Sequence, residues 1–229
     1  MITKDIKMAD LIHMNHQLLV VLERFRIPLG FENKTITEIC EKHNINLNFF
    51  LIIINAYNDE NYLPEENLEC CFVSDLIQYL KNSHRYYINE KFPFLRNMIE
   101  QFANESEDPK ARLLINFFSE YFAEVKEHME YEDRVVFPYI MELSKSSSSS
   151  QSEYNIRTYT DLHDHIEEKV IDLKSILIKY LPPTKAQSQR IQILFELFRL
   201  EEDLELHGKI EDKLLVPMVQ KMENESLNR

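Results

Sequence analysis

An internal repeat with an offset of 79 residues is the strongest constraint on how this chain folds. The segment HMEYEDRVVFPYI at residues 128–140 returns as HGKIEDKLLVPMV at residues 207–219. The same offset aligns His84 with His163, and apolar positions follow it too. Because histidine occupies only 8 of 229 positions, two histidine matches at one offset are not expected by chance. The chain therefore contains a duplicated pair of segments.

Each half of this duplication is expected to be a pair of helices. Only two glycines occur in the chain, so tight hairpins and Gly-rich phosphate loops have little material to be built from. Apolar residues recur at helical spacing. The sequence thus predicts an all-α protein, an up-down four-helix bundle with a small N-terminal helical domain, whose long helices cover residues 73–104, 108–144, 153–180 and 184–223.

The predicted domain boundaries follow from changes in composition. Residues 1–60 have the apolar spacing of a compact helical unit, in which Thr35 or Thr37 would begin a helix and Thr35 is followed three residues later by Glu38. Residues 61–72 form a linker, within a polar and asparagine-rich stretch that carries a proline. Residues 73–229 form the bundle.

Charge and apolar content exclude several classes of partner. The formal net charge is −13, which repels phosphate backbones and anionic membranes, so we expect neither a nucleic acid nor a membrane as partner. No stretch approaches the roughly 20 apolar residues that span a bilayer. The first residues lack the apolar core of a signal peptide, which predicts a cytoplasmic protein. Its cysteines, without metal or disulfide spacing, are expected to be reduced thiols: Cys40, Cys70 and Cys71.

The repeat also predicts a metal centre. Each half offers a histidine, 43 intervening residues, and then His-x-x-x-Glu. Positions i and i+4 of a helix lie on one face about 6 Å apart, so each His-Glu pair can point at one cation. A separation of 44 residues lets the chain run along one helix and return on the next to the same level. The predicted metal ligands are His84, His128, Glu132, His163, His207 and Glu211.

Four imidazoles and two carboxylates suit two non-haem iron ions, because carboxylates can bridge two ions and offset their charge. Zinc sites use fewer ligands and often thiolates. If each iron takes five or six ligands, the six side chains leave room for an oxo or hydroxo bridge and for NO, O₂ or peroxide. The Glu-x-x-His motif of ferritin-like centres is absent, since Val125 and Leu204 stand at the glutamate positions.

Several assignments have alternatives. His165 stands near His163, but only His163 preserves the repeat, so we expect His165 to face solvent or a neighbouring helix. Asp133 or Asp212 could bridge in place of the adjacent glutamate, whereas the simpler interpretation is a solvated acid paired with the basic residue that follows it.

Other residues near the predicted ligands have two readings as well. Pro138 and Pro217 most simply bend or end their helices. Gly208 either leaves room for a small ligand or occupies a tolerant surface position, although glycine inside a helix costs roughly 1 kcal/mol. Some tyrosines could tune the metal from a second layer, namely Tyr87, Tyr131 and Tyr139.

The order His … His-x-x-x-Glu, occurring twice, resembles the hemerythrin-like fold over residues 73–223, and within it the Repair of Iron Centers (RIC) di-iron proteins. The segment SDLIQYLKNSHRYYINEKFPFL is similar to the first bundle helix of that family. Oxygen-carrying hemerythrins have a fifth histidine where this chain has Glu167. The RIC pattern of four histidines and two bridging glutamates maps onto the six ligands named above. The adjacent cysteine pair usual in that family's N-terminal unit is missing here.

This resemblance implies a function in nitrosative and oxidative stress. Proteins of this family repair damaged iron–sulfur clusters, by donating iron or by reducing NO to N₂O, so iron–sulfur proteins are expected partners. Whether this chain is an enzyme of the NO reductase type stays open. An alternative is a hemerythrin-like protein that binds or senses O₂ or NO without turnover, and a third is a structural bundle without a metal role.

Overall fold

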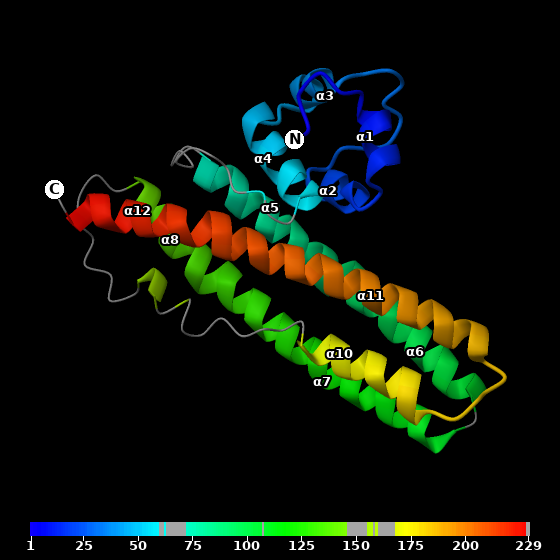
Figure 1. Cartoon of the computed structure of the whole chain (residues 1–229). Coiled ribbons are helices and arrows are strands. Elements are labelled where there is room, and N and C mark those ends of the chain that lie inside the picture. The colour runs from blue at the N-terminus through cyan, green and yellow to red at the C-terminus, as the bar shows by residue number, and fades with distance from the viewer. Residues whose placement is uncertain are drawn as a thin grey trace. The chain divides into compact units, whose positions relative to one another are not determined.

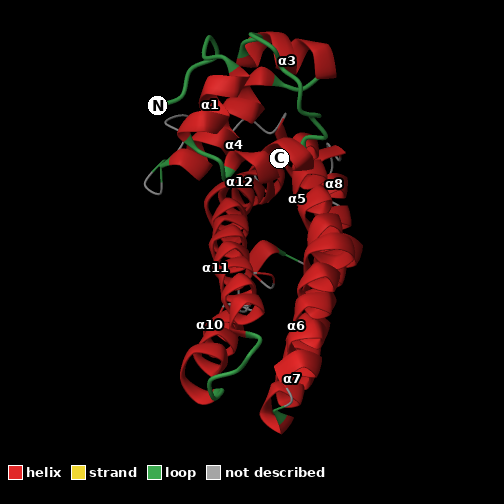
Figure 2. Cartoon of the chain, turned by 90° about the vertical axis from the view of Figure 1, so that its right-hand side faces the viewer, coloured by secondary structure: helices red, strands yellow, loops and turns green. Residues whose placement is uncertain are grey.

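The computed structural model describes residues 1–59, 62, 72–106, 108–145, 155–157, 159 and 168–227 (Figure 1). Regular structure in these ranges is helical, and the β contact is an isolated bridge between Lys7 and Thr35. Figure 2 shows the same parts as helices joined by loops. The predicted all-α fold is confirmed. Within the described ranges, no helix is both long and apolar enough to cross a lipid bilayer.

The chain divides into two compact units. The first comprises Met1–Ser83, Tyr139–Ile156 and Lys209–Arg229, and the second comprises His84–Pro138 and Arg157–Gly208. The domain boundaries predicted from composition, at 1–60, 61–72 and 73–229, stay a prediction.

The N-terminal part of the first unit consists of short helices: α1 (Met8–Met14), α2 (Leu18–Arg24), α3 (Ile36–His43) and α4 (Leu47–Asn58). Helix α3 begins with a capping box, in which the Thr35 hydroxyl accepts from the Glu38 N–H and the Glu38 carboxylate accepts from the Thr35 N–H. Thr35 is therefore the N-cap, as one of the two predicted starts proposed.

Aromatic side chains hold the first unit together. The ring of Phe25 packs against those of Phe50 and Tyr79, with centroids 5.0 and 5.1 Å apart. The buried guanidinium of Arg24 donates to the hydroxyl of Tyr57. Since Tyr79 belongs to the first long helix, these contacts attach the start of that helix to the N-terminal helices.

Cys40 is a buried free thiol in α3. Burial raises its pKa to about 12, because the thiolate would lose its hydration. A thiol with this pKa is protonated at neutral pH and reacts slowly. The expectation of a reduced thiol holds for Cys40, while Cys70 and Cys71 lie outside the described residues.

The long helices are runs of α-helix interrupted by five-residue π-helical segments. Three of these long runs are described over most of their length, and they match the predicted helices that start near residues 73, 108 and 184. The runs are α5 (Val73–Tyr86), Tyr87–Lys91 and α6 (Phe92–Ser106); α7 (Pro109–Tyr131), Glu132–Val136 and α8 (Phe137–Lys145); and α11 (Gln187–Ile210), Glu211–Leu215 and α12 (Val216–Leu227). The other run is described as α10 (Glu168–Ser175) followed by Ile176–Tyr180, and most of its predicted first half lies outside the described residues.

Each π-helical segment is followed by one residue and then by a proline. The residues after the segments donate their backbone N–H to the carbonyl five positions back, and they are Phe92, Phe137, Leu181 and Val216. Proline has no N–H and its ring crowds the carbonyl four positions back, so the wider turn accommodates it. Pro138 and Pro217 were predicted to bend or end their helices; they do not end them, because α8 and α12 continue beyond them.

In the second unit, four helical segments surround one apolar core. Helix α6 packs on α7 through the stacked rings of Phe92 and Phe122, with centroids 4.9 Å apart. Charged pairs join the other neighbours, and these are Lys169 of α10 with Glu124 of α7, Lys174 of α10 with Glu201 of α11, and Lys91 before α6 with Glu196 of α11. The contacts close a ring of four segments, as the predicted four-helix bundle requires.

Candidate metal centre

The two copies of His-x-x-x-Glu occupy equivalent places in their helices. His128 lies in the last turn of α7, and Glu132 begins the π-helical segment that follows. His207 lies near the end of α11, and Glu211 again begins a π-helical segment. His84 lies in the last turn of α5. The four-residue spacing turns each His-Glu pair toward one side of its helix.

Four of the six predicted ligands converge. The Nε2 atom of His84 lies 3.3 Å from Nε2 of His207 and 3.3 Å from Oε2 of Glu132. Glu211, one turn beyond His207, completes a group whose ligand atoms all lie within 4.8 Å of one another. Opposite ligands at bond lengths of about 2.1 Å are about 4.2 Å apart, so small side-chain movements would close this group on one ion.

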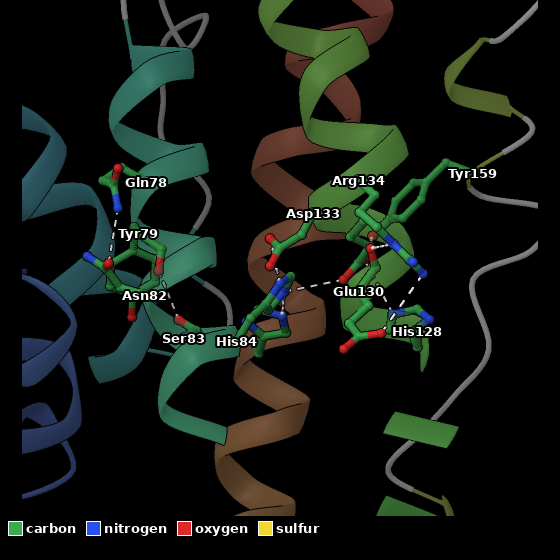
Figure 3. Close-up of polar contacts among 12 residues, drawn as sticks. Gln78, Tyr79, Asn82, Ser83, His84, His128, Glu130, Asp133, Arg134 and Tyr159 are labelled. Carbon is green, nitrogen blue, oxygen red and sulfur yellow. Dashed lines mark hydrogen bonds and ion pairs between the residues drawn. The ribbon is translucent and has the colours of Figure 1, made fainter. Parts of the chain in front are cut away.

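Glu132 faces a different histidine with each of its oxygens. Oε2 is near His84, whereas Oε1 lies 3.3 Å from Nε2 of His128. Figure 3 labels both histidines. His128 comes from the same helical run as Glu132, and its side chain keeps 16% exposure. Glu132 is thus oriented as a carboxylate that bridges two positions would be.

The charge state of Glu132 also suits a cation. Burial raises the pKa of its carboxyl, but the imidazoles of His128 and His84 beside it outweigh burial and hold the pKa well below its ordinary value. The side chain is therefore a carboxylate at neutral pH, with lone pairs to offer a metal.

The donor set itself fits a metal ion. His84, Glu132, His207 and Glu211 are at most 3% exposed. Burying two carboxylates and two imidazoles costs free energy unless opposite charge compensates them. A divalent or trivalent cation at their centre supplies that compensation, and nitrogen with oxygen donors suits iron and related metals.

Aromatic rings fix the orientation of two histidines. The ring of His84 stacks on Phe137, with centroids 5.5 Å apart and an interplanar angle of 20°. The ring of Tyr87 meets His207 edge to face at 5.6 Å. Tyr87 is therefore beside a predicted ligand, as the sequence suggested, and its hydroxyl donates to the Asp203 carbonyl. Tyr139, in contrast, donates to Glu223 at 2.6 Å.

Tyr159 donates a hydrogen bond to a predicted ligand and was not among the residues predicted from the sequence. The buried hydroxyl of Tyr159 donates to Oε1 of Glu132 at 2.8 Å (Figure 3). Tyr159 could have been found, because it stands four residues before the predicted ligand His163. Asp133 had been considered only as a bridge or a solvated acid.

The structure gives Asp133 a third environment. Its Oδ1 lies 3.2 Å from Nδ1 of His84, on the side of the ring opposite Nε2. The following residue, Arg134, is directed to Glu130 instead, donating from Nε to its carbonyl oxygen at 3.0 Å. The predicted pairing of Asp133 with Arg134 is therefore wrong. Asp212, its counterpart in the repeat, is exposed.

The remaining predictions concern the third predicted helix and Gly208. His163, His165 and Glu167 lie outside the described residues, so the choice of His163 stays a prediction. At Gly208, an added Cβ would meet no described atom within 4 Å. No close approach among the described residues therefore requires a glycine there.

Comparison with known proteins agrees with this geometry. The family of the hemerythrin HHE cation binding domain matches residues 75–225. Over 152 residues the chain is also 24% identical to the iron-sulfur cluster repair protein ScdA of Staphylococcus haemolyticus (strain JCSC1435), an alignment that covers 65% of this chain and 68% of that protein. Because the domain match spans most of the chain and includes every residue of the converging group, this protein belongs to the hemerythrin HHE cation binding domain family.

Proposed function

We propose that this chain is a non-haem di-iron protein that repairs iron–sulfur clusters damaged by nitric oxide or oxidants. The observation that carries the proposal is the orientation of Glu132, whose two oxygens face His84 and His128 separately. One carboxylate that serves two ion positions is the feature expected of a two-metal centre. The cytoplasmic location predicted from the sequence is part of the proposal.

The internal repeat supports the second ion position. The 79-residue offset relates His84 to His163 and His128 to His207. His84 and His207 lie together, so the same relation assigns His163 and His128 to the other ion. Glu132 and Glu211 are related by the repeat as well, so Glu211 would hold the ions in the same way as Glu132. The six predicted ligands thus divide evenly between two iron ions.

The repair role is supported by the family and by the named relative, an iron-sulfur cluster repair protein. Iron in such a centre supplies open positions for NO, O₂ or peroxide and exchanges electrons with them. The protein's own contribution is to hold the ligands and to exclude water: Phe137 covers one face of the His84 ring and Tyr87 meets the ring of His207. Iron–sulfur proteins are the proposed partners.

Burial of the centre favours a second candidate function. His84, Glu132, His207 and Glu211 are almost inaccessible to solvent among the described residues, which suits a diatomic ligand better than direct transfer of iron to another protein. A protein that binds or senses O₂ or NO without turnover would need only such a buried site.

Iron loading tests whether the centre exists. Protein expressed with iron should contain about two irons per chain and show the near-ultraviolet absorption of bridged ferric ions. The variant Glu132→Ala should lose both, whereas Glu130→Ala, which removes an acid two residues away on the surface of the same helix, should keep both. Unchanged iron in Glu132→Ala would contradict the proposal.

Reaction with NO separates the candidate functions. Repeated N₂O release from the reduced protein supports reduction of NO, and restored activity of an NO-damaged iron–sulfur enzyme supports repair. NO that stays bound without N₂O release, together with a failure to restore the enzyme, supports sensing. The variant Glu132→Ala provides the background rate in each assay.

A further inference from the structure

His84 is held on three sides. Its Nε2 faces His207 and Glu132, each at 3.3 Å. Its ring lies against Phe137, and its Nδ1 lies 3.2 Å from Oδ1 of Asp133. Asp133 and Phe137 come from the same helical run, four residues apart, so one helix places a carboxylate at the ring's second nitrogen and an aromatic ring on its face.

We propose that Asp133 is a positioning residue that holds His84 in the tautomer with its proton on Nδ1 and thereby presents the Nε2 lone pair to the metal. A carboxylate only accepts hydrogen bonds, so the nitrogen facing Asp133 carries the proton. The other nitrogen of a neutral imidazole is then the acceptor, and Nε2 lies at hydrogen-bond distance from Nε2 of His207. Nε2 also lies 3.3 Å from Oε2 of Glu132, but that oxygen makes no hydrogen bond with the described residues. The negative charge of Asp133 also raises the basicity of the ring and strengthens its bond to a metal.

The local backbone explains why adjacent residues can act on both nitrogens of one ring. Glu132 and Asp133 are the first two residues of the π-helical segment Glu132–Val136. Glu132 is fully buried and approaches Nε2, whereas Asp133 keeps 36% exposure and approaches Nδ1. The two carboxylates therefore have different tasks, the first as a predicted ligand and the second as the partner of a ligand.

Nitrogen chemical shifts test the tautomer without any metal. In the metal-free protein, at a pH where histidine is neutral, a long-range proton–nitrogen spectrum should show His84 with a protonated Nδ1. The signal is assigned by its loss in His84→Gln. In Asp133→Ala it should move toward the Nε2–H form that a free imidazole prefers, whereas Asp133→Asn should retain the Nδ1–H form because the amide oxygen still accepts.

Iron affinity tests the consequence, and only this arm rests on the proposed function. Competition with a chelator should show a loss of roughly 10- to 100-fold in Asp133→Ala, the usual effect of removing a hydrogen-bond partner of a metal ligand. Asp133→Asn should lose less. Glu130→Ala is the matched control, since Glu130 is an acid of the same helix with 44% exposure that pairs with Lys126, and its affinity should be unchanged.

The outcomes separate this inference from the proposed function. An Nε2–H tautomer in the wild-type protein, or wild-type shifts and affinity in Asp133→Ala, would overturn the role of Asp133 while leaving the metal centre intact. If the wild-type protein bound no iron, the proposed function would fail, and the metal-free spectra would still decide whether Asp133 sets the tautomer. Unfolding curves of the metal-free variants show that an affinity change is not a loss of fold.

Discussion

The Nε2 atoms of His84 and His207 lie 3.3 Å apart although 123 positions separate the residues in the chain. Adjacent ligands of one ion at bond lengths of about 2.1 Å are about 3.0 Å apart, so this pair is close to the spacing that a shared ion imposes. The relation joins the first and last long helical runs at one point. If the two histidines bind one ion, as proposed, each of them is needed to hold it.

Replacing either histidine should therefore remove metal and stability together. In His84→Ala or His207→Ala, iron content should fall by half or more, and the iron-loaded protein should melt at a lower temperature. A ligand present at 100 times its dissociation constant adds about 2.7 kcal/mol to folding, and this contribution is lost with the site. Metal analysis and calorimetry measure both effects. Full iron content in either variant would contradict the shared site. The control is His13→Ala, because His13 is exposed and lies outside the predicted ligand set.

The choice between His163 and His165 is open to the same assay. His163→Ala should lower the iron content as His128→Ala does, because the repeat pairs these two histidines at the second ion. His165→Ala should keep its iron. Loss of iron from the His165 variant alone would assign the ligand to His165 and break the 79-residue relation at that position.

Tyr159→Phe should lower the stability of the protein and shift the absorption of the metal centre without loss of iron. The substitution removes only the hydroxyl that donates to Oε1 of Glu132 at 2.8 Å. Loss of one buried hydrogen bond should lower the free energy of unfolding by about 1 kcal/mol in the metal-free protein, measured with urea. The ferric absorption bands should shift, since Glu132 loses a donor. Tyr180→Phe, at a position 66% exposed, should change neither quantity.

Glu196 should contribute to stability in a defined pH range. Burial raises its pKa, but the hydrogen bond and charge of Lys91, with the charge of Arg199, outweigh burial and hold the pKa below its ordinary value of 4.5. A group whose pKa is lower in the folded state stabilises the fold above the pKa of the unfolded chain, and this contribution disappears as the pH falls through the folded value. Unfolding free energy should thus decline below about pH 4.5 less steeply in Glu196→Gln than in the wild type.

Chemical denaturation at several acidic pH values checks this expectation on the metal-free protein. Glu100→Gln is the matched control, because Glu100 pairs with Arg96 on the surface with 43% exposure. Exposed pairs of this kind contribute little, so the control should follow the wild type. Identical slopes for all three proteins would mean that the Lys91–Glu196 pair does not stabilise the bundle.

Gly208→Ala should stabilise the metal-free protein. Glycine inside a helix costs up to about 1 kcal/mol relative to alanine, and no described atom lies within 4 Å of the added methyl group. Melting temperature and urea midpoint should both rise. If the space beside His207 instead receives a small ligand, the variant should be more stable and yet bind NO or O₂ more weakly, which titration of the reduced protein would show.

The amino-acid pattern alone determined the helical class, the two pairs of long helices and the spacing of the candidate ligands. Helical periodicity is local, and a 79-residue duplication is visible in the letters themselves. The Thr35 cap was predictable for the same reason, since both halves of its capping box lie within four residues. Scarcity of glycine excluded competing folds without any knowledge of packing.

Tertiary structure alone decided which groups meet the ligands from other helices. The hydroxyl of Tyr159 reaches Glu132, and the carboxylate of Asp133 reaches His84 rather than Arg134. Periodicity assigns a residue to a face of its helix but says nothing about the side chain that faces it across the bundle. A π-helical turn before a proline changes that face locally, so helical spacing alone does not give the direction of the side chains in it.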